Sequence, residues 1–338
     1  MKVSAVIPTR NREHSVMRLC KNLQEQTVAL SEIIIVDSSD DKEYKDRLIE
    51  SFPDLPLVWI DSSPSVCIQR NKGIAKATSS WIFLCDDDIE MPVDYMEKLT
   101  EFTHKNPDSG AVSGLWLNLE RGQWQDQYKV KSFKDLSWRF IFQLSVWGDL
   151  DSDKSPTLFR PFFVMMRKWY AQRANSNSLA GWPLITNWEG EFFKTRFYSL
   201  GASLVKKEWL LQSPYDEVLD ASGLGDNYGV AIRFPKSIHI LTTTHIHHHK
   251  AAENRLAGKT AYYRRVLALH YFIKLNKNSN ASTLWLIWSL IGNALYYLGK
   301  RDKALLTATV KALTLMITEK NPYWIGHQKD EHVIQPVC

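Results

Sequence analysis

Three consecutive carboxylates, Asp86–Asp88, directly follow the apolar run Trp81–Cys85. An apolar run of this length predicts a strand buried on both faces. Three adjacent aspartates at its end would repel one another unless a cation lay among them. In an extended backbone the side chains of Asp86 and Asp88 leave the same face. That arrangement suits a hard divalent ion, Mg²⁺ or Mn²⁺, which keeps positions open for phosphate oxygens. The alternative is a solvated acidic turn before a helix opened by Pro92.

A further candidate carboxylate, Asp226, follows Gly225 at the start of a predicted helix. A carboxylate there can cap the first helical turn. The partial positive charge of the helix N-terminus also favours the ionised form, which suits a proton acceptor. The two roles are compatible, and Asp216 is the rival proton acceptor.

The elements that must position these carboxylates alternate between strand and helix patterns over the first hundred residues. Strands are predicted at Val3–Pro8, Ile33–Val36, Leu57–Ile60 and Trp81–Cys85, and helices at His14–Gln26, Tyr44–Ser51 and Ser65–Ala77. Such alternation predicts an α/β fold with a mainly parallel sheet and helices on both faces. Ligands of these sheets bind beyond the carboxyl ends of the strands. The polar clusters Thr9–Arg12, Asp37–Asp41 and Asp86–Asp88 should therefore line one site.

Glycine-rich phosphate loops are missing near these strand ends. Neither a dinucleotide-binding fingerprint nor a P-loop is present, which argues against both classes. Phosphate groups would instead be met by arginines and by the metal ion.

Four motifs resemble the nucleotide-binding half of family 2 glycosyltransferases, which have the GT-A fold. They are Val6–Arg12, Ile33–Asp37, Gln69–Ala75 and Phe83–Asp88. The resemblance covers residues 1–115 and continues more weakly over 199–250. It implies a Rossmann-like, mixed and mainly parallel sheet, and inverting transfer from a nucleotide-diphospho-sugar.

The resemblance also implies roles for individual residues. Donor contacts would come from the following residues: Pro8, Thr9, Arg10, Arg12, Asp37, Arg70, Asp86 and Asp87. Asp86 and Asp88 would hold the metal, and Asp226 would be the general base. The family usually has an acidic residue that helps to read uracil where this sequence has Ser38. The base is therefore left open, with a UDP-sugar favoured as the donor.

A histidine-rich run lies downstream of Asp226. Strand alternation places His245, His247 and His249 on one face. The resemblance implies a third metal ligand here, and histidine is a common one. A purely structural role is the alternative, and among the candidate ligands we favour His247 and then His245.

Residues 116–198 are rich in tryptophan, and tryptophan rings can stack on sugars or fill a core. Core packing is favoured for any single tryptophan. Glu189 and Glu191 are weak candidates for contact with an acceptor.

The basic charge of the chain is concentrated after residue 250. Residues 251–338 contain 12 Lys and Arg against 5 Asp and Glu, a net charge of +7, whereas residues 1–250 carry −2. An apolar helix is expected at Leu284–Leu298 and an amphipathic one at Lys303–Ile317. Basic charge beside apolar helices fits peripheral contact with an anionic membrane surface through residues 262–317. Packing on the catalytic domain or on a second subunit is the alternative. No nucleic-acid motif accompanies the basic charge, which argues against nucleic-acid binding.

The expected organisation is a GT-A catalytic domain over 1–250, divided at 115/116 into donor and acceptor halves, and a helical region over 251–338. We expect a metal-dependent glycosyltransferase that acts on a glycan or lipid-linked acceptor. By analogy, its setting is bacterial surface polysaccharide synthesis of the capsule or O-antigen type. Four cysteines without disulfide spacing and a strand-like N-terminus favour the cytoplasm, at the inner membrane face. A nucleotidyltransferase and a non-catalytic nucleotide-sugar-binding protein are the other classes considered.

Overall fold

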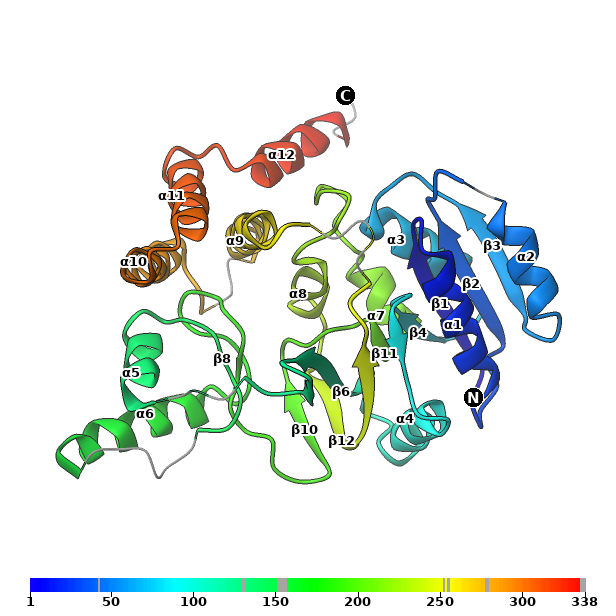
Figure 1. Ribbon diagram of the computed structural model, residues 1–338, viewed down its shortest axis with the longest axis horizontal. Helices are drawn as coiled ribbons and strands as arrows, with labels where there is room; N and C mark the ends of the chain where they lie inside the picture. The colour runs from blue at the N-terminus through cyan, green and yellow to red at the C-terminus, as the bar shows by residue number, and fades with distance from the viewer. Residues whose placement is uncertain are drawn as a thin grey trace. The chain divides into compact units, whose positions relative to one another are not determined.

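The computed structural model describes residues 1–41, 43–128, 130, 132–150, 157–251, 253, 256–276 and 280–334. The chain forms two compact units, each described by itself (Figure 1). The sheet unit comprises Met1–Gln127, Trp188–Glu217 and Ala221–Arg255, and the helical unit comprises Tyr128–Asn187, Val218–Asp220 and Leu256–Cys338. The sheet unit ends close to the expected boundary at residue 250. Residues 128–187, expected in the acceptor half, group with the C-terminal helices.

The sheet unit is built on one large mixed sheet. Its strands are β1 (Val3–Thr9), β2 (Glu32–Asp37), β3 (Leu57–Asp61), β4 (Trp81–Cys85), β5 (Ile89–Glu90), β6 (Ala111–Glu120), β7 (Gln123–Gln125), β10 (Phe192–Thr195), β11 (Ala202–Lys206) and β12 (Ile238–His248). The main order is β10-β12-β6-β11-β4-β1-β2-β3, with β5 paired to β12 and β7 to β6. Strands β4, β1, β2 and β3 run parallel, and β11 is antiparallel to both of its neighbours. The α/β sheet predicted from the sequence is confirmed.

The helices of the sheet unit follow the strands in the expected alternation. They are α1 (Glu13–Gln24), α2 (Tyr44–Ser51), α3 (Val66–Lys76), α4 (Tyr95–Lys105), α7 (Lys207–Gln212) and α8 (Asp226–Ala231). The side chain of Ser65 caps α3 by accepting a hydrogen bond from the backbone N–H of Ile68. Helix α3 packs closely on β1 because Gly73 has no side chain: a Cβ at this position would lie 2.4 Å from Cγ1 of Val6. This close contact fixes the residues at the start of α3 against the ends of β1 and β2.

The helical unit contains α5 (Phe133–Ile141), the 3-10 turn η2 (Thr157–Phe159), α6 (Arg160–Gln172), α9 (Gly258–Leu275), α10 (Thr283–Lys300), α11 (Lys303–Ile317) and α12 (Pro322–Ile334), with the short strands β8 (Val146–Trp147) and β9 (Leu184–Ile185). Helix α11 packs against both α9 and α10. Among the residues that the structure describes, no helix is both long and apolar enough to cross a bilayer.

Candidate active site

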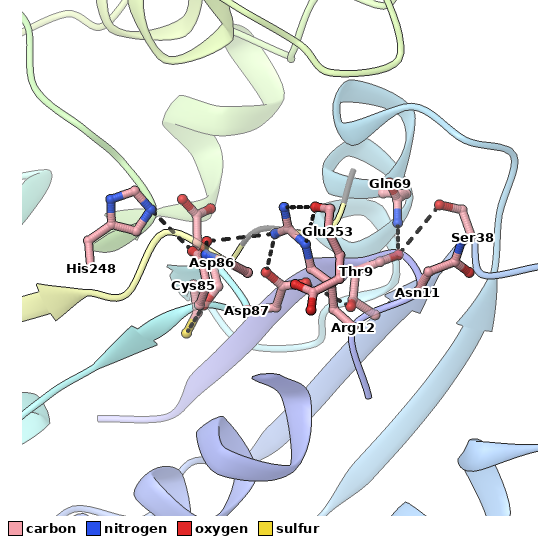
Figure 2. A network of polar contacts seen from close by, with 12 residues as sticks. Thr9, Asn11, Arg12, Ser38, Gln69, Cys85, Asp86, Asp87, His248 and Glu253 are labelled. Atoms are coloured by element: carbon pink, nitrogen blue, oxygen red, sulfur yellow. Dashed lines mark hydrogen bonds and ion pairs between the residues drawn. The ribbon is translucent and has the colours of Figure 1, made fainter. Parts of the chain in front are cut away.

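The loop after β1 is joined to the acidic loop after β4. Oγ1 of Thr9 donates a hydrogen bond of 2.8 Å to Asp87, and the guanidinium of Arg12 donates one of 2.8 Å to the same carboxylate. Arg12 also donates to the backbone carbonyl of Glu253 at 2.9 Å (Figure 2). Burial raises the pKa of Asp87 to about 6, although Arg12 favours its ionised form. Two of the polar clusters expected at one site are therefore in direct contact.

The third cluster, at the end of β2, supports the loop after β1. The carboxylate of Asp37 is fully buried and accepts hydrogen bonds from both the backbone N–H and the hydroxyl of Ser39. The hydroxyl oxygen of Ser39 in turn accepts a 2.7 Å hydrogen bond from the backbone N–H of Asn11. Arg10 forms a 3.4 Å ion pair with Asp40, whose side chain is 72% exposed. Asp37 thus fixes the loop conformation through its hydrogen bonds with Ser39.

Gln69, at the start of α3, ties the two strand ends together. Its side-chain amide donates to the backbone carbonyl of Thr9 at 2.8 Å and to that of Val36 at 2.7 Å. The residue is buried, so both bonds lie away from solvent. Sequence reasoning gave Gln69 no role of its own. Its place as the first residue of the motif Gln69–Ala75 was the available signal.

Asp88 lies next to a histidine, but the histidine is His248. Nε2 of His248 is 3.3 Å from Oδ1 of Asp88, and the backbone N–H of Ala251 donates to Oδ2 of Asp88 at 3.0 Å. Burial acts to raise the pKa of Asp88, but contact with His248 outweighs it and lowers the pKa to about 2. Asp88 is therefore held as a carboxylate beside an imidazole nitrogen.

The rings of His245 and His247 lie elsewhere. Their centroids are 5.0 Å apart, and the ring of His247 is 4.3 Å from that of Trp124. Trp124 is also 5.6 Å from the ring of His249, so the three alternate histidines do share one face, as predicted. The assignment of His245 and His247 as metal ligands stays a prediction.

The acidic loop also differs from the extended chain on which the sequence argument depended. Strand β4 ends at Cys85, and a turn at Asp87–Asp88 follows, so strand alternation does not apply there. Asp86 contacts Arg70, whereas Asp88 contacts His248. Among the described residues, no three His, Cys, Asp or Glu side chains converge in a geometry that could hold a metal ion.

Arg70 joins the acidic loop to Asp226. One terminal nitrogen of its guanidinium donates to Asp86 at 2.5 Å, and the other donates to Asp226. The guanidinium also lies 4.9 Å from the ring centroid of Tyr215, in a cation–π contact. Burial raises the pKa of Asp226 to about 6, and Arg70 opposes that rise. Three groups from α3, the acidic loop and α8 thus form one buried ion-pair network.

Two glycines, Gly225 and Gly201, lie beside the carboxylates of this network. Gly225, not Asp226, is the N-cap of α8 and has φ +99°, so the expectation of an Asp226 cap is wrong. Asp226 is the first helical residue and accepts a 2.6 Å hydrogen bond from the backbone N–H of Asn227. At Gly201, an added Cβ would lie 2.2 Å from the Asp86 carboxylate. These contacts fix both carboxylates beside Arg70.

The tryptophans and glutamates considered as acceptor contacts differ in their burial. Trp182 and Trp188 are buried, as the core interpretation predicts, whereas Trp116 and Trp124 contact His248 and His247. Glu189 and Glu191 are exposed.

A mainly parallel sheet whose central strand ends in an acidic loop, next to the loop after β1, defines the GT-A class of folds. Crystal structures of this class support the assignment. One is GalNAc-T7 with UDP, GalNAc and Mn²⁺, with a TM-score of 0.53 and 13% identity over 87% of this chain and 54% of that one. Another is S. aureus TarS 1–349, with a TM-score of 0.51 and 13% identity over 100% of this chain and 93% of that one.

The chain belongs to glycosyl transferase family 2, whose sequence profile matches residues 4–172. It is 30% identical over 119 residues to glucosyl-dolichyl phosphate glucuronosyltransferase of Haloferax volcanii, a match that covers 34% of this chain and 38% of that protein. It is also 31% identical over 103 residues to the uncharacterized glycosyltransferase YwdF of Bacillus subtilis, over 30% of this chain and 38% of YwdF. Both matches span less than half of the relative's length.

Proposed function

We propose that this chain is a metal-dependent, inverting glycosyltransferase that moves a sugar from a nucleotide-diphospho-sugar to a hydroxyl group. One observation carries the proposal: Arg70 bridges Asp86 of the donor-side acidic loop and Asp226 at the start of α8. The two carboxylates are 140 residues apart in sequence, yet a single side chain contacts both. A donor bound at the acidic loop would therefore lie beside a carboxylate able to accept a proton.

The residues present fit a hard divalent ion with few protein ligands. Mg²⁺ and similar ions are usually held by one or two carboxylates, with substrate phosphates and water in the other positions. Asp88 offers a carboxylate oxygen, and the neutral imidazole of His248, whose Nε2 is 3.3 Å from Oδ1 of Asp88, offers a nitrogen ligand. We propose these two residues as the ligands for Mn²⁺ or Mg²⁺, with Asp86 also available. The ion would offset the charge that gathers on the departing diphosphate.

Asp226 is the proposed general base. It would take the proton of the acceptor hydroxyl, a contribution of typically about 10²–10⁴-fold in rate. Its pKa of about 6 is close to neutral, so it is ionised at pH 7 yet basic enough to accept a proton. Arg70 keeps part of the negative charge compensated in a buried site. Thr9 and Arg12 hold the acidic loop in place for the donor.

The donor and acceptor are proposed by class alone. A structural relative carries UDP, GalNAc and Mn²⁺, and a relative in sequence is named for transfer to a dolichyl phosphate-linked sugar. We infer a UDP-sugar donor and a glycan or lipid-linked acceptor. Synthesis of a bacterial surface polysaccharide at the cytoplasmic membrane face fits this chemistry.

The test is a panel of nucleotide sugars with Mn²⁺ or Mg²⁺, followed by Asp226→Asn. A true donor should raise the melting temperature of the wild type, because binding stabilises the native state. Asp226→Asn should keep that stabilisation and lose at least about a hundredfold of the turnover. If turnover persists unchanged, Asp226 is not the base. If no nucleotide sugar raises the melting temperature, the donor assignment fails.

A further inference from the structure

Helix α10 exposes an apolar stripe. Leu284, Trp288, Ile291, Leu295 and Leu298 follow the i, i+4, i+7, i+11, i+14 spacing that places side chains along one face. Their exposed fractions are 79%, 40%, 39%, 49% and 61%. The stripe therefore runs over the length of the helix.

The opposite face of α10 packs within the helical unit and carries two buried leucines, Leu286 and Leu290, together with Ser289 and Gly292. The indole N–H of Trp182 donates to the buried hydroxyl of Ser289 at 2.7 Å. Gly292 lies against the ring of Phe142, where an added Cβ would be 2.3 Å from a ring carbon. Asn293 donates to the hydroxyl of Tyr262 at 3.2 Å.

The outer face of a helix that contacts water is normally polar, whereas the outer face of α10 is apolar. Apolar side chains therefore lie on both faces of the helix, and the outer ones leave a contiguous apolar surface of the kind found where proteins meet a partner or a membrane. The tryptophan of the stripe adds to the pattern, because tryptophan prefers the boundary between water and acyl chains. The indole N–H of Trp288 donates to the backbone carbonyl of Ile141, which fixes the ring at the surface.

The charged residues of the α10–α11 hairpin are mainly basic. Residues 280–318 contain Lys300, Arg301, Lys303 and Lys311 against the single acidic residue Asp302. The side chain of Asp302 is used to cap α11, where it accepts from the backbone N–H of Leu305. A second copy of the chain would present the same excess of basic residues, and Asp302 is the one acidic residue of its hairpin to pair with them. An anionic lipid surface is complementary to them.

We propose that the exposed stripe of α10 and the basic residues Lys300 and Lys303 form a docking surface for an anionic phospholipid bilayer. The helix lies in the plane of the interface, with its apolar face among the upper acyl segments. This surface goes beyond the proposed transfer reaction and is tested independently of it. Docking through this surface would keep the protein at the membrane, where lipid-linked molecules are found.

The experiment is co-sedimentation of the full chain with phosphatidylcholine vesicles that contain or lack phosphatidylglycerol. The wild type should bind the anionic vesicles, and binding should weaken with salt. Leu284→Glu and Leu298→Glu should each lower the partition coefficient by at least about tenfold. Each variant loses a leucine that the bilayer would bury and gains a negative charge that anionic lipid repels. Lys300→Gln with Lys303→Gln should lower it on anionic vesicles alone.

Leu211→Glu on α7 is the matched control, because Leu211 is 57% exposed but belongs to the sheet unit. Its vesicle binding should equal that of the wild type, and all variants should keep the wild-type melting temperature. The proposal is overturned if the wild type does not bind anionic vesicles, or if Leu211→Glu loses binding as strongly as Leu284→Glu. It is equally overturned if Leu284→Glu keeps vesicle binding and instead converts a dimer into a monomer in gel filtration with light scattering.

Discussion

Replacement of Arg70 by glutamine removes the cation that lies between Asp86 and Asp226. An unfolded aspartate has a pKa of about 3.9, and that of folded Asp226 is about 6, a rise of roughly two units or about 3 kcal/mol. The raised pKa means that the folded state binds this proton more tightly. In the wild type, Asp226 therefore costs no stability below pH 4, and the cost grows as the pH rises from about 4 to 6.

Arg70→Gln should raise the pKa of Asp226 further, because a neighbouring arginine typically lowers the pKa of an aspartate by about 1–3 units. The acid limb of the kcat–pH profile should then move to higher pH by at least about one unit. Turnover at pH 7 falls because the base is protonated, and part of it returns near pH 9. The free energy of unfolding at pH 7 should drop by up to about 3–5 kcal/mol, the usual cost of removing one partner of a buried ion pair, because the remaining carboxyl groups must take up a proton or stay unpaired.

The assay is release of nucleoside diphosphate from the donor across a pH series, with urea unfolding in parallel. Arg47→Gln is the control, because Arg47 forms an exposed pair with Glu13 away from the carboxylate network. Adding Asp226→Asn to Arg70→Gln should recover part of the lost stability by removing one unpaired charge. An Arg70→Gln enzyme with a higher KM but an unmoved acid limb would refute the reasoning and leave Arg70 as a donor contact only.

Three further outcomes follow from the site and its support. Removal of divalent metal with EDTA should abolish donor hydrolysis, and Mn²⁺ or Mg²⁺ should restore it; full activity in EDTA would contradict the metal assignment. His248→Ala should raise the metal concentration needed for half-maximal activity by about tenfold or more, whereas His247→Ala should change it little. If His247→Ala has the larger effect, His247 is the metal ligand, as the sequence predicted. Gly73→Ala should destabilise the protein in urea unfolding, because overpacking against Val6 costs about 1–3 kcal/mol and exceeds the helix-propensity gain of about 1 kcal/mol. A more stable Gly73→Ala protein would show that α3 can shift away from β1.

The sequence missed the short β5 and gave no bounds for α4, but it predicted β1 to β4 and α1 to α3 to within two residues of their bounds. This is because their apolar periodicity is local and strong. It also predicted that Asp86–Asp88 would meet the loop after β1, since the carboxyl ends of parallel strands share one edge. Both expectations depend on properties of short segments, and the structure confirms them.

Local periodicity could not identify the histidine that lies beside Asp88. Strand β12 changes register between Leu241 and His245, and its pairing sets His248 opposite Ile89 of β5. A shift of one residue moves every side chain to the other face of a sheet, so local alternation cannot choose between His247 and His248. The choice depends on how three separate strands pair.

Local pattern alone thus predicted the α/β class of fold, the acidic loop and a helix that begins near Gly225. Only the tertiary structure decided that Asp226 lies within that helix and pairs with Arg70, 156 residues away, and that α10 leaves a stripe of apolar residues exposed. The physical reason is that periodicity records which residues share a face of one element. The partner of that face is set by contacts between elements that the sequence does not place side by side.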